Sequence, residues 1–185
     1  MKPKVFGIGF HKTGTSSLAD ALRMLGYSVT GPNNVRDPEI ASKALPMALE
    51  LATQFDAFQD NPWPVLYREM DAAFPGSKFI LTERAPEAWI DSAVTHFGDK
   101  HTPMREWIYG YGMPLGHEDV YLARFHRHNA EVRAYFADRP GDLLILDITK
   151  GGGWQELCSF LGYPVPAAPF PHSNPRSRRP NPAIG

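Results

Sequence analysis

The sequence predicts an α/β fold, a three-layer α/β/α sandwich with a mostly parallel central sheet. Short apolar runs alternate along the chain with segments whose apolar residues recur at the 3.6-residue period of a helix, and this βαβα alternation builds parallel sheets. The first run, residues 4–9, is nearly all apolar, as expected for a central strand covered on both faces. The length of 185 residues suits one domain.

The first strand and helix, residues 4–26, predict an anion site. The strand ends at Gly9, a helix follows from Gly14, and Gly26 stops it. The apolar stripe of this helix consists of Leu18, Ala21, Leu22 and Leu25. The unpaired amides at the start of such a helix, together with its dipole, favour a phosphate or sulfate in the preceding loop.

The loop between them departs from a Walker A loop in one position. Residues 9–16 keep both glycines and the final hydroxyl of G-x-x-x-x-G-K-[ST], but Thr15 stands where the lysine belongs. The lysine is instead Lys12. The alternative interpretation is an ordinary Gly/Thr/Ser-rich turn with a solvated lysine.

The K-x-G-T-[ST]-[ST] pattern after a buried strand resembles the 5′-phosphosulfate loop of the sulfotransferases, which use 3′-phosphoadenosine 5′-phosphosulfate (PAPS) as donor and release PAP. The resemblance implies a P-loop NTPase-like fold and a metal-free donor site. The donor-binding residues that it implies in the loop are Lys12, Thr13, Gly14, Thr15, Ser16 and Ser17. Lys12 would also be catalytic, because it would neutralise charge on the bridging oxygen as PAP leaves.

The next elements continue the alternation. We expect a short strand at 27–30 and a helix that starts near Asp37, runs towards Gln54 and is kinked or split by Pro46. A short strand at 57–59, a helix around 64–74, a buried strand at 78–82 and a helix from Pro86 follow.

Arg84 lies where the strand at 78–82 gives way to this helix. Sulfotransferases carry an Arg-x-Pro turn with a serine eight positions beyond the arginine, and both contact the donor's 3′-phosphate; Arg84, Pro86 and Ser92 match that spacing. A guanidinium binds a phosphate bidentately and a serine adds one donor. The alternative is a surface arginine paired with a neighbouring acid.

Asp60 is the predicted general base. It follows the strand at 57–59, at the edge where open α/β sheets bind ligands, and it resembles by position the base of sulfotransferases that modify glycans. His11, within the loop itself, is the rival. The third interpretation is that Asp60 only caps a helix starting at Pro62.

Residues 98–117 are rich in Gly, Pro and aromatic residues without a clear period. We expect a long loop that recognises the acceptor or acts as a lid, although its aromatics could equally form a packing cluster. A helix over 118–137 and a strand at 143–147 follow. That strand, ending in Asp147, imitates Walker B and supports a Mg-dependent P-loop kinase or NTPase; otherwise Asp147 caps the next turn.

The C-terminal part contains a short helix from Trp154 to Gly162 and then a Pro-rich tail. The segment GGGWQELCSFLGYPVPAAPFPHSN resembles the C-terminal part of a sulfotransferase-like family of bacteria and eukaryotes. We therefore predict one domain over 1–163 and an extension over 164–185. The latter includes Asn174, Arg176, Arg178 and Arg179, which either replace the 3′-phosphate element of cytosolic sulfotransferases or only solubilise the tail.

The charge composition limits which classes of partner the protein is expected to bind. A net charge of −1, with 19 basic and 20 acidic residues, argues against nucleic acid and anionic membranes, and we expect a cytoplasmic protein without a leader. The single Cys158 is expected to be a buried structural thiol. The acceptor is expected to be a small molecule or a glycan; a homodimer is left open, as is a module that binds PAP without catalysis.

Overall fold

The computed structural model describes residues 2–151 and 153–173. These residues form a five-stranded sheet in the order β2-β3-β1-β4-β5, in which every neighbouring pair is parallel. The strands are β1 (Val5–Gly7), β2 (Val29–Thr30), β3 (Ala57–Phe58), β4 (Lys78–Thr82) and β5 (Leu143–Leu146). The predicted parallel sheet is confirmed.

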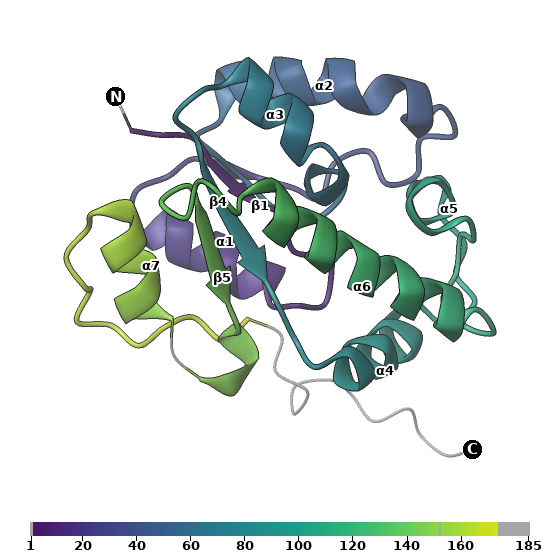
Figure 1. The fold of residues 1–185 in the computed structure, drawn as a ribbon. Helices are drawn as coiled ribbons and strands as arrows, with labels where there is room; N and C mark the ends of the chain where they lie inside the picture. Colours follow the sequence, from purple (N-terminus) through teal and green to yellow (C-terminus); the bar gives the residue numbers. More distant parts are fainter. Residues whose placement is uncertain (1, 152, 174–185) are drawn as a thin grey trace.

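Helices cover both faces of the sheet, which completes the predicted three-layer, P-loop-like sandwich (Figure 1). One face packs against α1 (Thr15–Met24) and α7 (Trp154–Leu161). On the other face lie α2 (Ile40–Gln54), α3 (Tyr67–Ala73), α4 (Pro86–Phe97), α5 (Pro103–Tyr109) and α6 (Glu118–Tyr135). Right-handed crossovers explain why the helices divide between the two faces. The connection from β1 to β2 runs towards one edge of the sheet, whereas the connections after β2 run towards the opposite edge.

The larger core holds the central strand in place. Phe6 of β1 stacks between Phe58 and Phe79 of the neighbouring strands, with ring centroids 4.7 and 5.4 Å away. All three rings are fully buried, and each contributes roughly 1.5–3 kcal/mol by leaving water. This packing fixes the carboxyl end of β1, from which the predicted anion loop emerges.

The structure corrects two expectations about α2. Pro46 does not split this helix, which is continuous from Ile40 to Gln54 and has the buried residues Ala44, Ala48 and Ala52 on both sides of the proline; the alternative, a kink at Pro46, stays a prediction. The helix also begins later than expected, because Asp37 accepts a hydrogen bond from the amide of Glu39 and forms a turn there instead.

The segment 98–117 is not one long loop, because it contains α5. The Thr102 side chain caps this helix by accepting from the amide of Arg105 at 3.3 Å, and Pro103 occupies its first turn. Gly110 ends it in the left-handed region at φ +85°. These local signals were present in the sequence but were hidden by its lack of an apolar period.

Residues 164–173 follow the surface without helix or strand. Phe170 is buried against Trp154, whose indole donates to the carbonyl of Ala168 at 2.9 Å, so this part of the extension is packed onto α7. Residues 174–185, including the four tail residues singled out above, lie outside the described residues. Cys158 is buried, as expected, and burial raises the pKa of its thiol.

Candidate functional site

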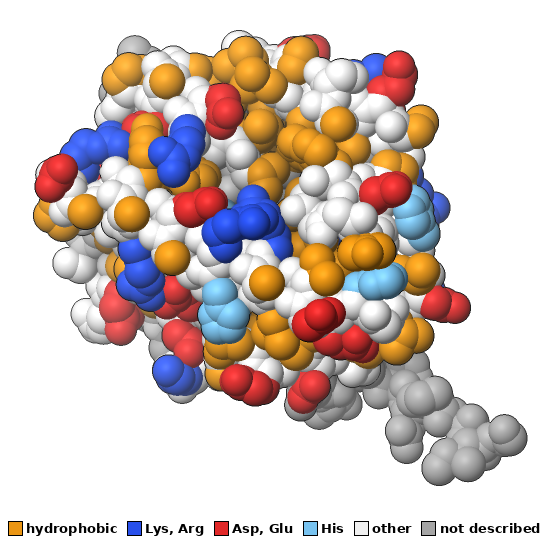
Figure 2. Space-filling view, turned by 45° about the vertical axis from the view of Figure 1, so that its right-hand side comes forward, with side chains coloured by type: hydrophobic (Ala, Val, Ile, Leu, Met, Phe, Trp, Pro, Cys, Tyr) orange, Lys and Arg blue, Asp and Glu red, His pale blue; other side chains and the backbone are white. Residues whose placement is uncertain are grey.

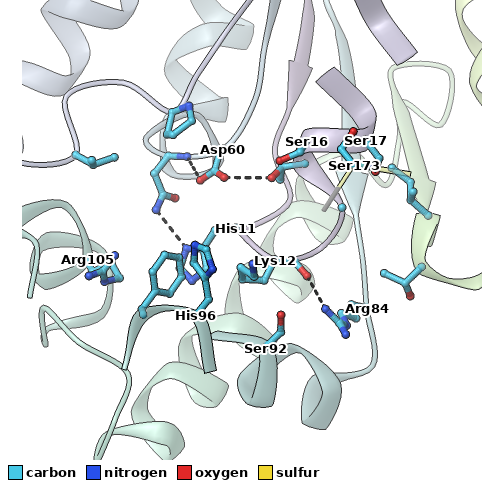
Figure 3. Close-up of a pocket in the computed structure, with 18 of the residues that line it drawn as sticks. His11, Lys12, Ser16, Ser17, Asp60, Arg84, Ser92, His96, Arg105 and Ser173 are labelled. Carbon is cyan, nitrogen blue, oxygen red and sulfur yellow. Dashed lines mark hydrogen bonds between the residues drawn. The ribbon is translucent and has the colours of Figure 1, made fainter. Parts of the chain in front are cut away.

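A cavity of about 710 Å³ opens at the carboxyl edge of the sheet. It has the size typical of small-molecule sites. Of the predicted site residues, the following line it: His11, Lys12, Gly14, Thr15, Ser16, Ser17, Asp60, Arg84 and Ser92. Predicted site residues up to 81 positions apart, His11 and Ser92, are thus brought into one pocket (Figure 3).

The β1–α1 loop forms the middle of this pocket. Gly14 has φ +102°, a left-handed conformation that glycine adopts without strain, and it turns the chain into α1. The first bond of the helix runs from the amide of Leu18 to the carbonyl of Gly14, so the three amides before Leu18 have no helical partner. Lys12 also has a positive φ of 67°. The loop therefore presents amides, a helix dipole and an ammonium group, as an anion requires.

Thr13 lies underneath the loop. Its hydroxyl donates to the carbonyl of Phe10 at 2.7 Å and is hydrogen-bonded to Thr82 of β4 at 2.6 Å. This side chain is fully buried and is not among the residues that line the cavity. Thr13 thus anchors the loop to the sheet. Its predicted contact with the sulfuryl donor stays a prediction, and only its backbone amide is placed to make that contact.

Arg84 and Ser92 lie at one end of the pocket, on the β4–α4 connection and on α4 (Figure 3). The Arg84 guanidinium donates to the carbonyl of Lys12 at 3.1 Å, which ties it to the anion loop. Ser92 is buried on the same side of the pocket. Their proximity agrees with a common phosphate partner.

Asp60 lies across the pocket from Ser92 (Figure 3). Its carboxylate accepts hydrogen bonds from the Thr15 hydroxyl at 3.1 Å and from the amide of Asn61 at 2.7 Å. The short helix at Trp63–Val65 has no side-chain cap, so the capping interpretation is wrong. Burial raises the pKa of Asp60, and the hydrogen bonds and Lys12 only partly oppose it.

His11 is almost fully buried, with 3% of its surface exposed. Its Nδ1 lies 3.4 Å from both the Asn61 amide nitrogen and the Tyr109 hydroxyl, whereas Nε2 has no protein partner. Burial, with the charges of Arg105 and Lys12, lowers the pKa of His11 to about 3. The ring is therefore neutral at physiological pH, and burial moves its pKa away from neutrality while it moves the pKa of Asp60 towards neutrality.

Sequence reasoning missed several residues of the pocket. Arg105 and His96 line it from α5 and α4, and His172 and Ser173 line it from the C-terminal segment. The amide of Ser173 donates to the Ser17 hydroxyl at 3.0 Å, which brings this segment to the start of α1. The resemblance of the motif at 170–174 was the available signal for the last two; Arg105 had none.

Asp147, the Walker B candidate, is engaged elsewhere. It accepts from the amide and hydroxyl of Thr149 at 3.0 and 2.5 Å and pairs with Lys150 at 3.1 Å. It does not belong to the cavity lining. Over residues 2–151 and 153–173, no group of three or more His, Cys, Asp or Glu residues could hold a metal ion, and no helix there is long and apolar enough to cross a membrane.

Comparison with known proteins agrees with this geometry. A family model described as a sulfotransferase domain matches residues 4–118 and 102–179, so the chain belongs to that family. A protein of Aspergillus versicolor, Ava biosynthesis cluster protein M, is 26% identical over 214 residues; the alignment covers 91% of this chain and 80% of the relative. A sulfotransfer-type function follows from the family.

Proposed function

We propose that this protein transfers a sulfuryl group from PAPS to a hydroxyl or amine. The observation that carries the proposal is the gathering of Lys12, Arg84, Ser92 and Asp60 around one pocket at the start of α1. Cations, free amides and a carboxylate base are what such a transfer needs, and family membership supplies the reaction class.

The residues present fit a donor with two anionic ends. The amides at the start of α1, with Lys12 and Ser16, would hold the 5′-phosphosulfate. Arg84 and Ser92 would hold the 3′-phosphate. We call these residues, with Gly14, Thr15 and Ser17, the donor end of the pocket. Three cationic side chains line the described cavity against the single carboxylate of Asp60, so its charge balance suits a polyanion.

When bound, PAPS would supply the sulfuryl group, and PAP would be the leaving group that takes the electron pair of the bridging sulfur–oxygen bond. Lys12 would neutralise the negative charge that develops on the bridging oxygen, which stabilises the transition state more than the ground state. Thr15 would hold the Asp60 carboxylate towards the acceptor through the hydrogen bond already present.

Asp60 would take the proton of the acceptor hydroxyl, because a neutral hydroxyl is a poor nucleophile. Burial raises the pKa of Asp60 towards neutrality and lowers that of His11, which favours Asp60 as the base. An amine acceptor that is protonated in solution would first have to lose one proton to become a nucleophile. Asp60 could then accept a second proton from the same nitrogen as the sulfur–nitrogen bond forms.

Thermal shift with PAP, compared with ATP plus Mg²⁺, tests the donor. A ligand that binds only the folded chain stabilises it by roughly 2.7 kcal/mol at a hundredfold excess over its Kd, so PAP is expected to raise Tm and ATP with Mg²⁺ is not. A larger rise in Tm with ATP and Mg²⁺ would indicate a P-loop kinase or NTPase instead. If the protein binds PAP but turns over PAPS with none of a broad panel of acceptors, it would be a PAP-binding module without catalytic activity.

A further inference from the structure

The pocket contains one cation that the proposed donor does not use. Arg105 lies on the far side of His11 from Arg84, with Lys12 between them (Figure 3). Apolar side chains gather at this end of the cavity, and the polar side chains of His96 and Thr102 line the cavity beside them. We call it the acceptor end, and it consists of Pro32, Val35, Phe97, Met104 and Arg105.

Arg105 is a buried guanidinium, with 7% of its surface exposed. Its Nε donates to the carbonyl of Gly112 at 3.0 Å, its Nη2 donates to the carbonyl of Lys100, and its Cζ lies over the Phe97 ring, 4.4 Å from the ring centroid. Carbonyls and rings orient the group but carry no net charge. No ion pair joins Arg105 to a carboxylate among the described residues.

A buried charge without a counter-ion is costly, and the cost is offset when a ligand supplies the opposite charge. The positive charge of Arg105 also acts on the neighbouring His11. Among the charged groups, Arg105 makes the largest contribution to lowering the pKa of His11. The Nε2 of His11 is a further buried polar atom without a partner in this pocket. On the face of the molecule that Figure 2 shows, basic, acidic and apolar side chains are interspersed.

We propose that the acceptor carries a carboxylate, which Arg105 binds, on an apolar body whose hydroxyl or amine reaches Asp60. The inference rests on the proposed sulfuryl transfer, because it assigns the donor to the other end. A planar guanidinium matches a carboxylate through two parallel hydrogen bonds, and Phe97 and Met104 would pack on the body of the acceptor.

Matched pairs of probes test the acceptor class. The parent protein, saturated with PAP, is titrated by calorimetry with 4-hydroxybenzoate, 4-hydroxyphenylacetate and 3-(4-hydroxyphenyl)propionate, and with the primary amide of each. At least one acid is expected to bind about tenfold or more tightly than its amide, the usual worth of a charged hydrogen bond. Equal or undetectable binding of all the acids, with PAP bound, overturns the inference and leaves the donor assignment standing.

Variants of Arg105 distinguish binding of the acceptor carboxylate from a structural role. The second role has to be tested because Arg105 also donates hydrogen bonds to two backbone carbonyls. Arg105→Gln is expected to abolish the preference for the acid, Arg105→Lys to keep part of it, and the exposed control Arg127→Gln to leave it unchanged. Affinity for PAP should stay within about twofold throughout. A purely supporting role would weaken acid and amide equally, and that result overturns the proposal. Failure of the parent to bind PAP would instead overturn the donor site.

Discussion

The donor end and the acceptor end of the pocket are built in different ways. The loop of the donor end is continuous in sequence, and its geometry comes from the backbone: a glycine in the left-handed region, free amides and a helix terminus. The acceptor end takes residues from three separate segments, and its one charge is held by the carbonyls of Lys100 and Gly112, on the same segment of the chain as α5. The difference teaches that the geometry proposed to bind the anion is a local property of one motif, whereas the geometry proposed to select the acceptor is assembled by the fold.

The largest effect is expected at the donor end. Lys12→Ala should bring turnover below detection, a loss of at least about 10³-fold, because the variant lacks the charge that meets the leaving oxygen. Steady-state assay with PAPS measures it, and Lys43→Ala, on the exposed face of α2, is the control. A change confined to KM would show that Lys12 only binds the donor.

Between the two ends, Asp60→Asn should lower kcat by roughly 10²–10⁴-fold and leave PAP affinity nearly unchanged. Asparagine can still accept from Thr15, so the structure is expected to persist. Asp91→Asn, exposed on α4, serves as the matched control. Near-parental kcat in Asp60→Asn, together with a collapse in His11→Ala at unchanged PAP affinity, would transfer the role of base to His11.

At the far side of the donor end, Arg84→Ala should weaken PAP binding by roughly 1.5–3 kcal/mol, about ten- to a hundredfold. Its contact with the carbonyl of Lys12 is a single hydrogen bond, so the loop should survive. Calorimetry compares it with Arg127→Ala. If Arg84→Ala binds PAP as tightly as the parent, the 3′-phosphate lies elsewhere.

The smallest effect concerns how the free energy of unfolding depends on pH, where the buried histidines and the buried Asp60 act in opposite directions. Burial lowers the pKa of His11 to about 3 and that of His128 to about 4, so the unfolded chain binds more protons below about pH 6.5. Stability should fall by roughly 2 kcal/mol per histidine between pH 6.5 and 5. Asp60 acts in the opposite sense, because its raised pKa favours the folded state as acid is added.

Denaturant unfolding at several pH values measures this dependence. His11→Gln and His128→Gln should each flatten it, while His126→Gln, exposed on α6, should not. An unchanged slope in His11→Gln would mean that the ring is already charged in the folded protein.

The donor loop could be predicted from the sequence because its signals are local. A glycine fixes the turn, hydroxyls and a lysine follow at set spacings, and an apolar strand and an amphipathic helix flank them; the structure has each of these. The positions of Asp60 and Arg84 followed from the rule that the carboxyl ends of parallel strands meet at one edge. Their roles in the reaction stay predictions.

Only the tertiary structure decided the rest. Whether Pro46 breaks a helix depends on the alanine face that packs on either side of it, and whether Arg105 is a surface charge or a buried one depends on α2 and α6, which pack against its helix α5. Burial and the field of distant charges are sums over the whole fold. The sequence by itself determined the β1–α1 loop and the parallel sheet. The pKa shifts of His11 and Asp60 and the burial of the cation at the acceptor end were decided by tertiary packing, because no short stretch of chain contains the groups that set them.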